Sequence, residues 1–219
     1  MCKILLSKGE LGKFCQEFLE RYNIKTDVGS EKPSLILNGK YVKFRVMRSR
    51  DVPRMFEKVS GDFGITGRDV VIDELLNGYD QDFNIIYSFK SCPDLVGNLC
   101  LLKKEETLKP RVVVSNYYEN IAERYLNLMV NEGEIEEYKL LVVRGSVEGY
   151  IAANEADVGI DTVYSGKTLE RINQFLIKKG ENPIEKINII ETYPVIIAKP
   201  NYSFDDFQNI LEKEGLLWK

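Results

Sequence analysis

The 219-residue sequence contains no histidine and only four cysteines. Without an imidazole, catalytic schemes that pair Ser or Cys with His are excluded, and so are metal sites that rely on His ligands. The cysteines show no C-x-x-C spacing, so we expect small buried side chains rather than a zinc site or a disulfide framework. Any metal is expected to be a hard cation such as Mg²⁺, held by carboxylates together with substrate phosphates and not by the protein alone.

Long apolar runs and an excess of positive charge are also missing. The first apolar run ends at Leu6, too early for a secretory signal, and no stretch is long enough to cross a membrane, so we expect a cytoplasmic protein. The net charge of −4 argues against a broad nucleic-acid surface, which would need a basic face.

The apolar pattern alternates between strands and helices. Apolar residues from Leu11 to Tyr22 follow the i, i+3, i+4 spacing of one helical face, and Asn38-Gly39 between two apolar runs indicates a hairpin with a tight turn. Further strands are expected at 3–6, 62–66, 112–114, 140–143 and 156–161, with helices near 53–59, 69–76, 147–154, 166–176 and 203–214. This order predicts an α/β fold.

One short segment occurs twice. Residues 61–66 read G-D-F-G-I-T, and residues 156–161 read A-D-V-G-I-D, each between two expected helices. One interpretation is two similar lobes with a central cleft and mixed sheets, as in type II periplasmic binding proteins; the other is chance, because D-x-G-I is a common entry to a buried strand. The first interpretation assigns 1–90 and 180–219 to lobe I and 91–179 to lobe II.

The segment from Asp161 to Leu169 is the richest candidate site. It leaves a strand, carries Thr162, Ser165, Gly166, Lys167 and Thr168, and opens a helix. Hydroxyls and free backbone N–H groups at a helix N-terminus bind phosphate. A nucleotide P-loop is excluded because Asp161 occupies the position of its first glycine. The alternative is that Ser165 and Thr168 only cap the helix.

Basic residues gather between positions 40 and 54. Arg48 and Arg50 follow a strand end, where guanidinium groups bind a pyrophosphate or triphosphate bidentately. Lys8 lies in the loop after the first strand, the usual ligand edge of an open α/β sheet. The alternative for all three is a solvated surface.

These segments together resemble the ATP phosphoribosyltransferase family. Residues 161–169 (D-T-V-Y-S-G-K-T-L), preceded by Glu148 and Asp157, are similar to its signature, and 46–53 (V-M-R-S-R-D-V-P), 64–70 (G-I-T-G-R-D-V) and 7–11 (S-K-G-E-L) resemble three other family segments in the same order. The chain departs from the pattern in four places: Ser7 replaces a proline, Glu10 an arginine and Asn154 a glycine, and residues 89–92 (F-K-S-C) match the family's F-G-x-C-x-L only in part.

The resemblance implies that ATP reacts with phosphoribosyl pyrophosphate, as at the start of histidine biosynthesis. It implies catalytic roles for Asp161, Glu148 and Arg48. Phosphoribosyl pyrophosphate would contact Lys8, Asp157, Asp161, Thr162, Ser165, Gly166, Lys167 and Thr168, while ATP would contact Arg48, Arg50, Gly67 and Asp69. The end of the chain at Lys219 resembles the short form of the family, which implies a homo-oligomer with a separate regulatory subunit.

Two other interpretations stay open. A small-molecule-binding module on the same fold would also have two lobes, and a regulatory paralogue would keep phosphate binding without catalysis. Glu10 and Asn154 are the residues that favour the paralogue.

Overall fold

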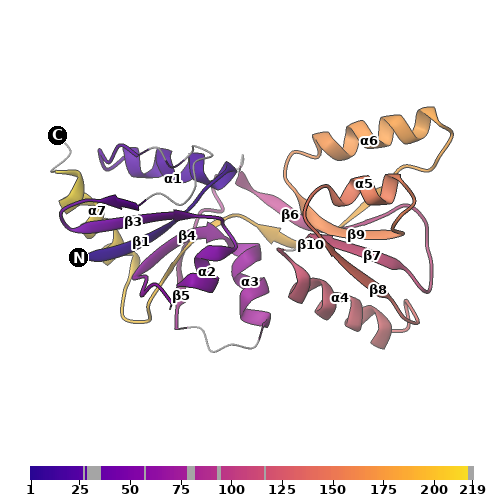
Figure 1. The fold of residues 1–219 in the computed structure, drawn as a ribbon, viewed down its shortest axis with the longest axis horizontal. Helices are drawn as coiled ribbons and strands as arrows, with labels where there is room; N and C mark the ends of the chain where they lie inside the picture. Colours follow the sequence, from indigo (N-terminus) through magenta and orange to yellow (C-terminus); the bar gives the residue numbers. More distant parts are fainter. Residues whose placement is uncertain are drawn as a thin grey trace. The chain divides into compact units, whose positions relative to one another are not determined.

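The computed structural model describes residues 1–26, 28, 36–56, 58–77, 82–92, 95–115 and 117–216. The chain divides into two compact units (Figure 1): unit 1 is Met1–Cys92 with Tyr193–Lys219, and unit 2 is Pro93–Thr192. The carboxyl-terminal part of unit 1 begins at Tyr193, because the strand that ends at Thr192 pairs within the sheet of unit 2.

The strands of unit 1 that the structure describes form a six-stranded mixed sheet in the order β2-β3-β1-β4-β11-β5. Its elements are β1 (Cys2–Ser7), α1 (Glu10–Glu20), β2 (Ile36–Asn38), β3 (Val42–Met47), α2 (Asp51–Met55), β4 (Phe63–Gly67), α3 (Arg68–Leu76), β5 (Asn84–Ser88), β11 (Pro194–Ala198) and α7 (Phe204–Gly215). Strands β3, β1 and β4 are parallel, so their carboxyl ends share one edge. Helix α1 covers one face, and α2 and α3 cover the other (Figure 1).

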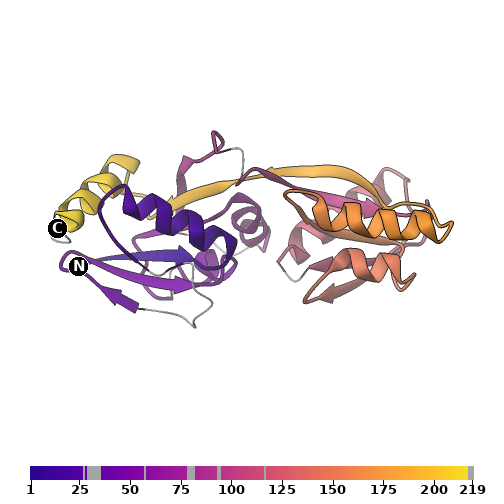
Figure 2. The same ribbon diagram turned by 90° about the horizontal axis from the view of Figure 1, so that it is seen from above.

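The described strands of unit 2 form a five-stranded mixed sheet in the order β10-β6-β9-β7-β8. Its elements are β6 (Gly97–Lys103), β7 (Arg111–Ser115), α4 (Glu119–Asn131), β8 (Lys139–Val143), α5 (Val147–Ala152), β9 (Val158–Val163), α6 (Lys167–Lys178) and β10 (Glu185–Thr192). Strands β8, β7 and β9 are parallel to one another. Strand β6 is antiparallel to β9 on one side and to β10 on the other, and β6 and β10 run side by side (Figure 2). Helix α4 covers one face, and α5 and α6 cover the other (Figure 1).

The two units repeat one topology. In unit 1 the parallel order is β3-β1-β4 with antiparallel β11 beside β4; in unit 2 it is β8-β7-β9 with antiparallel β6 beside β9. The D-x-G-I segments occupy equivalent places, at the start of β4 and of β9. The interpretation as structural duplication is therefore confirmed at the level of strand order.

The glycine of each repeated segment lets a helix pack closely on its strand. A Cβ on Gly64 would lie 2.8 Å from Val52 of α2, and a Cβ on Gly159 would lie 2.4 Å from Val147 of α5. Both distances are too short for carbon atoms, so the repeated glycine has a packing role in both units.

The expected hairpin at Asn38-Gly39 forms, but with a longer turn. Asn38 pairs with Lys43 inside the sheet, and the backbone N–H of Gly39 donates to Val42 O over 2.7 Å. Gly39 lacks the positive φ that a two-residue turn would need. The turn is instead fixed by the buried carboxylate of Glu214, which accepts from the backbone N–H groups of residues 40, 41 and 42 over 2.7–3.1 Å.

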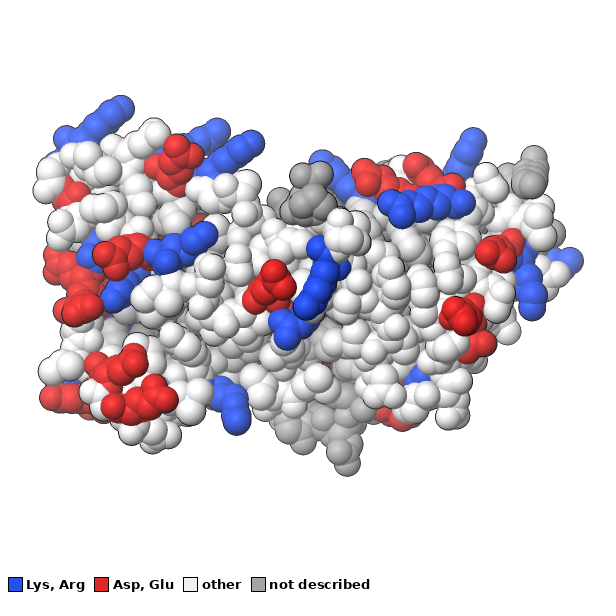
Figure 3. Space-filling view, turned by 180° about the vertical axis from the view of Figure 1, so that it is seen from behind, with Lys and Arg blue, Asp and Glu red and all other residues white. Residues whose placement is uncertain are grey.

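The surface and the cysteines agree with the composition. On the face in Figure 3, acidic and basic side chains are interspersed. Among the described residues, no helix is long and apolar enough to cross a membrane. All four thiols are free, and burial raises the pKa of Cys15 to about 12, which keeps that thiol protonated.

Candidate active site

The segment after β9 forms a candidate site at the carboxyl edge of unit 2. Gly166 has φ 71°, a left-handed conformation that favours glycine, and it caps the twelve-residue helix α6. The side chains of Ser165, Lys167 and Thr168 are exposed around this helix N-terminus. Exposed hydroxyls, a lysine and the positive end of a helix dipole together suit a phosphate group.

Asp161 and Thr162 lie near the end of β9, directly before this loop. Successive strand residues point to opposite faces, so Asp161 lies on the α5 and α6 side and Thr162 on the α4 side. The Asp161 carboxylate accepts from the backbone N–H of Thr162 over 2.8 Å. The Thr162 hydroxyl is hydrogen-bonded to the phenol of Tyr118, which is buried at the start of α4.

Sequence reasoning missed Tyr118. It follows β7, the parallel neighbour of β9, and the register that pairs Val114 with Ile160 brings the two strand ends together. No local motif marks a tyrosine for this role, because the contact depends on strand pairing across 44 residues.

Glu148 lies at the carboxyl end of β8, in the first turn of α5. Its carboxylate accepts from the hydroxyl of Ser146 over 3.1 Å, and the same hydroxyl accepts from the backbone N–H of Gly149. Glu148 is therefore held by a helix cap, at the edge of the sheet where the loop of 161–168 also lies.

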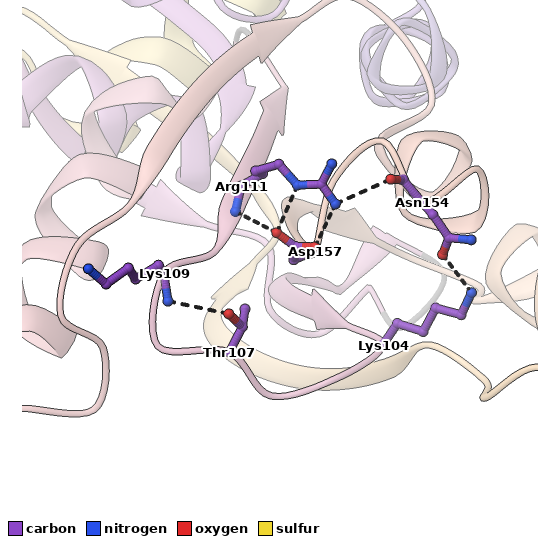
Figure 4. A network of polar contacts seen from close by, with 6 residues as sticks. All are labelled: Lys104, Thr107, Lys109, Arg111, Asn154 and Asp157. Atoms are coloured by element: carbon purple, nitrogen blue, oxygen red, sulfur yellow. Dashed lines mark hydrogen bonds and ion pairs between the residues drawn. The ribbon is translucent and has the colours of Figure 1, made fainter.

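Asp157 does not join these residues. It stands at the start of β9, four residues before Asp161, which is about 13 Å along an extended strand. Arg111 donates to its carboxylate from the backbone N–H at 2.8 Å and from the guanidinium at 2.8 and 3.0 Å (Figure 4). These hydrogen bonds hold the pKa of Asp157 below its usual value. Asp157 ties two strands together through Arg111, and its contact with phosphoribosyl pyrophosphate stays a prediction.

The replacement of a family glycine by Asn154 has a conformational explanation. Asn154 has φ 58° and follows the end of α5. Its N–H donates to Ile151 O and the N–H of Glu155 donates to Tyr150 O, which is a Schellman motif. Asparagine is the non-glycine residue that best tolerates this conformation. The Asn154 side chain also accepts from Lys104 (Figure 4).

The carboxyl edge of unit 1 carries a separate group of the residues predicted from the sequence. Arg48 and Arg50 follow β3, and Gly67 and Asp69 lie where β4 passes into α3. Ser49 joins the two segments. Its hydroxyl lies 2.8 Å from the Thr66 hydroxyl, and its backbone carbonyl oxygen accepts a hydrogen bond from the Thr66 hydroxyl. The structure thus brings together the four residues that the resemblance assigns to ATP.

The side chains in this edge differ in accessibility. Arg48 is exposed, Arg50 is half-buried with Nε 3.6 Å from the Asp51 carboxylate, and Asp69 is 2% exposed. The Asp69 carboxylate lies over Gly67, where a Cβ would be 2.4 Å from Oδ1. Arg48 is free to meet a ligand in solvent, whereas Asp69 shapes the start of α3.

Lys8 and Gly9 complete the same edge. Lys8 follows β1, and its backbone N–H donates to Met47 O over 2.8 Å, which fixes it beside the Arg48 segment. Gly9 has φ 79° and opens α1. Ser7, which replaces the family proline, is fully buried and donates to Ile65 O over 2.8 Å, so its hydroxyl has a structural role.

Two further cations at this edge were not predicted. The Arg68 guanidinium and the Lys90 ammonium lie 5.6 and 5.2 Å from the centre of the Tyr193 ring. Tyr193 precedes β11, whose first residue pairs with Gly67. No sequence pattern indicates this group, because β11 is antiparallel to β4 and comes from the far end of the chain.

The described residues also bear on metal binding. Among them, no three Asp, Glu or Cys side chains lie close enough together to hold a metal ion. Of the carboxylates predicted from the sequence, Asp161 lies directly before the loop of 162–168 that we expect to bind phosphate. A single carboxylate with substrate phosphates is the coordination that Mg²⁺ prefers, so these residues fit a metal that arrives with its substrate.

Comparison with known proteins agrees with this geometry. A model of the ATP phosphoribosyltransferase family matches residues 48–212. The chain is 30% identical over 171 residues to ATP phosphoribosyltransferase of Ruminiclostridium cellulolyticum, covering 76% of each chain. It is 25% identical over 197 residues to that of Sulfurisphaera tokodaii, covering 90% of this chain and 64% of the relative. The fold matches the ATP phosphoribosyl transferase (HisG:HisZ) complex from Thermotoga maritima, with TM-score 0.72, 17% identity, and coverage of 99% and 100%.

Proposed function

Because the chain belongs to the ATP phosphoribosyltransferase family, we propose that it joins N1 of the adenine of ATP to C1′ of 5-phosphoribosyl 1-pyrophosphate, releasing pyrophosphate. This reaction opens histidine biosynthesis. The observation that best supports it is the carboxyl edge of unit 2, where the left-handed Gly166 opens α6 among exposed hydroxyls directly after Asp161.

In this proposal the loop after β9 binds the 5′-phosphate. Ser165 and Thr168 donate hydroxyl hydrogen bonds, the backbone of α6 donates its first N–H groups, and Lys167 supplies positive charge. Asp161 accepts hydrogen bonds from the ribose hydroxyls, and the hydrogen bond to Tyr118 holds the Thr162 side chain at the other face of the strand end. Glu148 supplies a second carboxylate near the ribose.

The carboxyl edge of unit 1 binds phosphates of ATP and the pyrophosphate leaving group. Arg48 and Arg50 donate to the phosphate oxygens, and Lys8 adds positive charge. Positive charge develops on the ribose ring as pyrophosphate leaves, and the cations stabilise the departing anion. Positioning and electrostatics carry the reaction, which agrees with a chain that has no histidine to act as a base.

Mg²⁺ would be held by Asp161 and the substrate phosphates, where it would neutralise the pyrophosphate charge. Chelation with EDTA should abolish turnover, and added Mg²⁺ should restore it. If turnover survives a chelator, the charge neutralisation falls to the arginines and Lys8 alone.

We also propose that the chain works in an oligomer with a separate regulatory subunit. The support is the similarity of the fold to the HisG:HisZ complex of Thermotoga maritima, which has two different components. Analytical ultracentrifugation of the chain alone, and with a candidate regulatory subunit, measures both parts of this proposal.

The test of the proposed activity compares two aspartates of one strand. Asp161→Asn should lower turnover, or raise the KM for phosphoribosyl pyrophosphate, about tenfold or more, on the scale of a lost charge-assisted contact. Asp157→Asn is the matched control, since it changes the same side chain at the far end of β9 and should leave KM unaltered. The assay mixes ATP, phosphoribosyl pyrophosphate and Mg²⁺ and follows the absorbance of phosphoribosyl-ATP.

Three outcomes would count against the assignment. Absence of product with and without the regulatory subunit would leave a binding or regulatory protein. Stabilisation of the fold by amino acids in place of phosphoribosyl pyrophosphate would indicate a different ligand. Equal effects of the two aspartate substitutions would mean that the ribose site lies elsewhere.

A further inference from the structure

A basic cavity lies in unit 1, away from the residues of the candidate site. It has a volume of about 320 Å³, and its lining includes the side chains of Lys3, Lys43, Arg45 and Lys58. Lys3 stands at the start of β1, five residues before Lys8, which is about 16 Å along an extended strand. The cavity therefore belongs to the amino-terminal part of the sheet and not to its ligand edge.

The strand register concentrates the charge of this cavity. Lys3 pairs directly with Lys43 on the neighbouring parallel strand, and Leu5 pairs with Arg45 two residues on, so all four side chains share one face of the sheet. Like charges on directly paired residues repel each other. A protein with net charge −4 has many carboxylates that could offset this repulsion, yet none of the described residues lining the cavity is acidic.

The cations of the cavity are held in place but not neutralised. The Lys3 ammonium donates to the carbonyl oxygen of Val59 over 3.1 Å, which fixes it at the wall. Arg45 Nε is buried and has no hydrogen-bond partner among the described residues. Buried N–H groups of charged side chains are normally paired, and an unpaired one indicates a missing partner.

We propose that this cavity is a second anion site that binds the phosphate group of a small phosphorylated molecule. A guanidinium with three ammonium groups suits a doubly charged phosphate better than a single carboxylate. The volume exceeds that of one phosphate and lies at the lower end of small-molecule sites, so a phosphate monoester fits. Bound phosphate would accept from Arg45 Nε and remove the repulsion between Lys3 and Lys43.

The test uses inorganic phosphate and ribose 5-phosphate as probes. To keep the proposed phosphate loop out of the measurement, titration calorimetry is done in a Lys167→Gln/Thr168→Ala background. We expect saturable binding with Kd below about 1 mM, and an increase in Kd of about tenfold or more when Lys43→Gln/Arg45→Gln is added. Tighter binding of ribose 5-phosphate than of phosphate would identify a monoester as the ligand.

The matched control is Arg171→Gln/Lys178→Gln, which removes the same charge from exposed positions of α6. It should leave both Kd values unchanged. Equal weakening in the control would reduce the effect to net charge and overturn the proposal, as would an unchanged Kd in the cavity variant.

A stability measurement gives an independent test with a change of sign. In low-salt buffer without phosphate, Lys43→Gln should unfold at the same temperature as the wild type or above it, because repulsion is removed. With saturating phosphate, at ionic strength matched by NaCl, the wild type should become the more stable of the two. If phosphate stabilises both proteins equally, the cavity does not bind it.

Should the double variant fail to fold, Lys58→Gln replaces it, since Lys58 is exposed on the turn after α2. A several-fold rise in Kd is expected, and an unaltered Kd would contradict the proposal.

Discussion

The two units share a topology but differ in what fills their cores. Unit 1 packs rings: Phe18 stacks on Phe207 with centroids 6.0 Å apart, and Phe63 lies 4.9 Å from Phe207. The core cluster of unit 2 is aliphatic, centred on Val113, Val147 and other branched side chains. The shared strand order therefore does not depend on a shared core composition. It follows from the alternation of strands and helices.

The units keep the same device at the amino edge of their sheets. Asp62 accepts from the backbone N–H of Lys3 over 2.9 Å and from the Lys199 ammonium over 2.7 Å. Asp157 accepts from the backbone N–H and the guanidinium of Arg111. Each aspartate clasps its own strand to the parallel neighbour. The cation comes from a distant segment in unit 1 and from the neighbouring strand itself in unit 2.

The largest effect is expected where unit 1 has an element without a counterpart. Glu214→Ala leaves three backbone N–H groups of the β2–β3 turn without their acceptor, and should lower the free energy of unfolding by about 2–4 kcal/mol. Glu212→Ala is the control, because Glu212 lies in the same helix two residues earlier and its side chain is exposed. Urea denaturation measures the loss, and hydrogen exchange should locate it in β2 and β3. Equal exchange increases in unit 2 would refute a local role.

The repeated glycines give the next effect. Gly159→Ala places a Cβ 2.4 Å from Val147 and should cost about 2–3 kcal/mol, more than Gly64→Ala, whose nearest contact is 2.8 Å. Adding Val147→Ala to Gly159→Ala should recover part of the loss, as measured by a double-mutant cycle in urea. Additive losses would show that the helix does not rest on the strand at this glycine.

The hydrogen bonds that Asp62 and Asp157 accept should differ in their contribution to stability. Asp62→Ala and Asp157→Ala should each cost about 1–2 kcal/mol, with Asp62 the larger because its side chain is 16% exposed against 30% for Asp157. Thermal unfolding of the two variants measures the difference. A larger loss for Asp157 would mean that the guanidinium outweighs burial.

The smallest effect is on pH dependence, and its sign differs between the units. Hydrogen bonds from Arg111 lower the pKa of Asp157, so its stabilisation is complete above the unfolded pKa near 4 and is lost as pH falls through the folded value. The hydrogen bond to Asp62 raises the pKa of Lys199, so its stabilisation is lost as pH rises through the folded value, above about 10.4. Asp157→Asn should flatten the acid limb of a stability profile and Lys199→Gln the alkaline limb, each by less than about 1 kcal/mol.

The parallel strands and the hairpin strand β2 were predictable from the sequence, but the antiparallel strands β5 and β10 were not. Strand β10 is mostly exposed and lacks a clean alternation, and β5 is likewise an exposed edge strand. Neither is followed directly by a helix, so the pattern that identified β4 and β9 does not apply to them. Their identity depends on pairing with β6 and β11, which lie far away in sequence.

The candidate site was predictable where it is local and not where it depends on spacing along a strand. The loop of 165–168 consists of consecutive residues and can be recognised from a short stretch of sequence. In the structure Gly166 is left-handed and α6 begins directly after it, as a phosphate-binding loop requires. Asp157 was assigned to the same ligand as Asp161 by the family resemblance, and four residues separate the two along the chain. A strand extends about 3.3 Å per residue, so that spacing separates the two carboxylates.

The positions of Asp62 and Asp157 have a consequence for engineering. Asp62 and Asp157 secure the strands where they begin, and neither carboxylate lies at the strand ends that carry the candidate ligand residues. Substitutions chosen to raise thermal tolerance can be confined to the beginnings, and libraries that retune ligand preference can be confined to the ends. The two searches can then proceed in parallel and be combined with little interference.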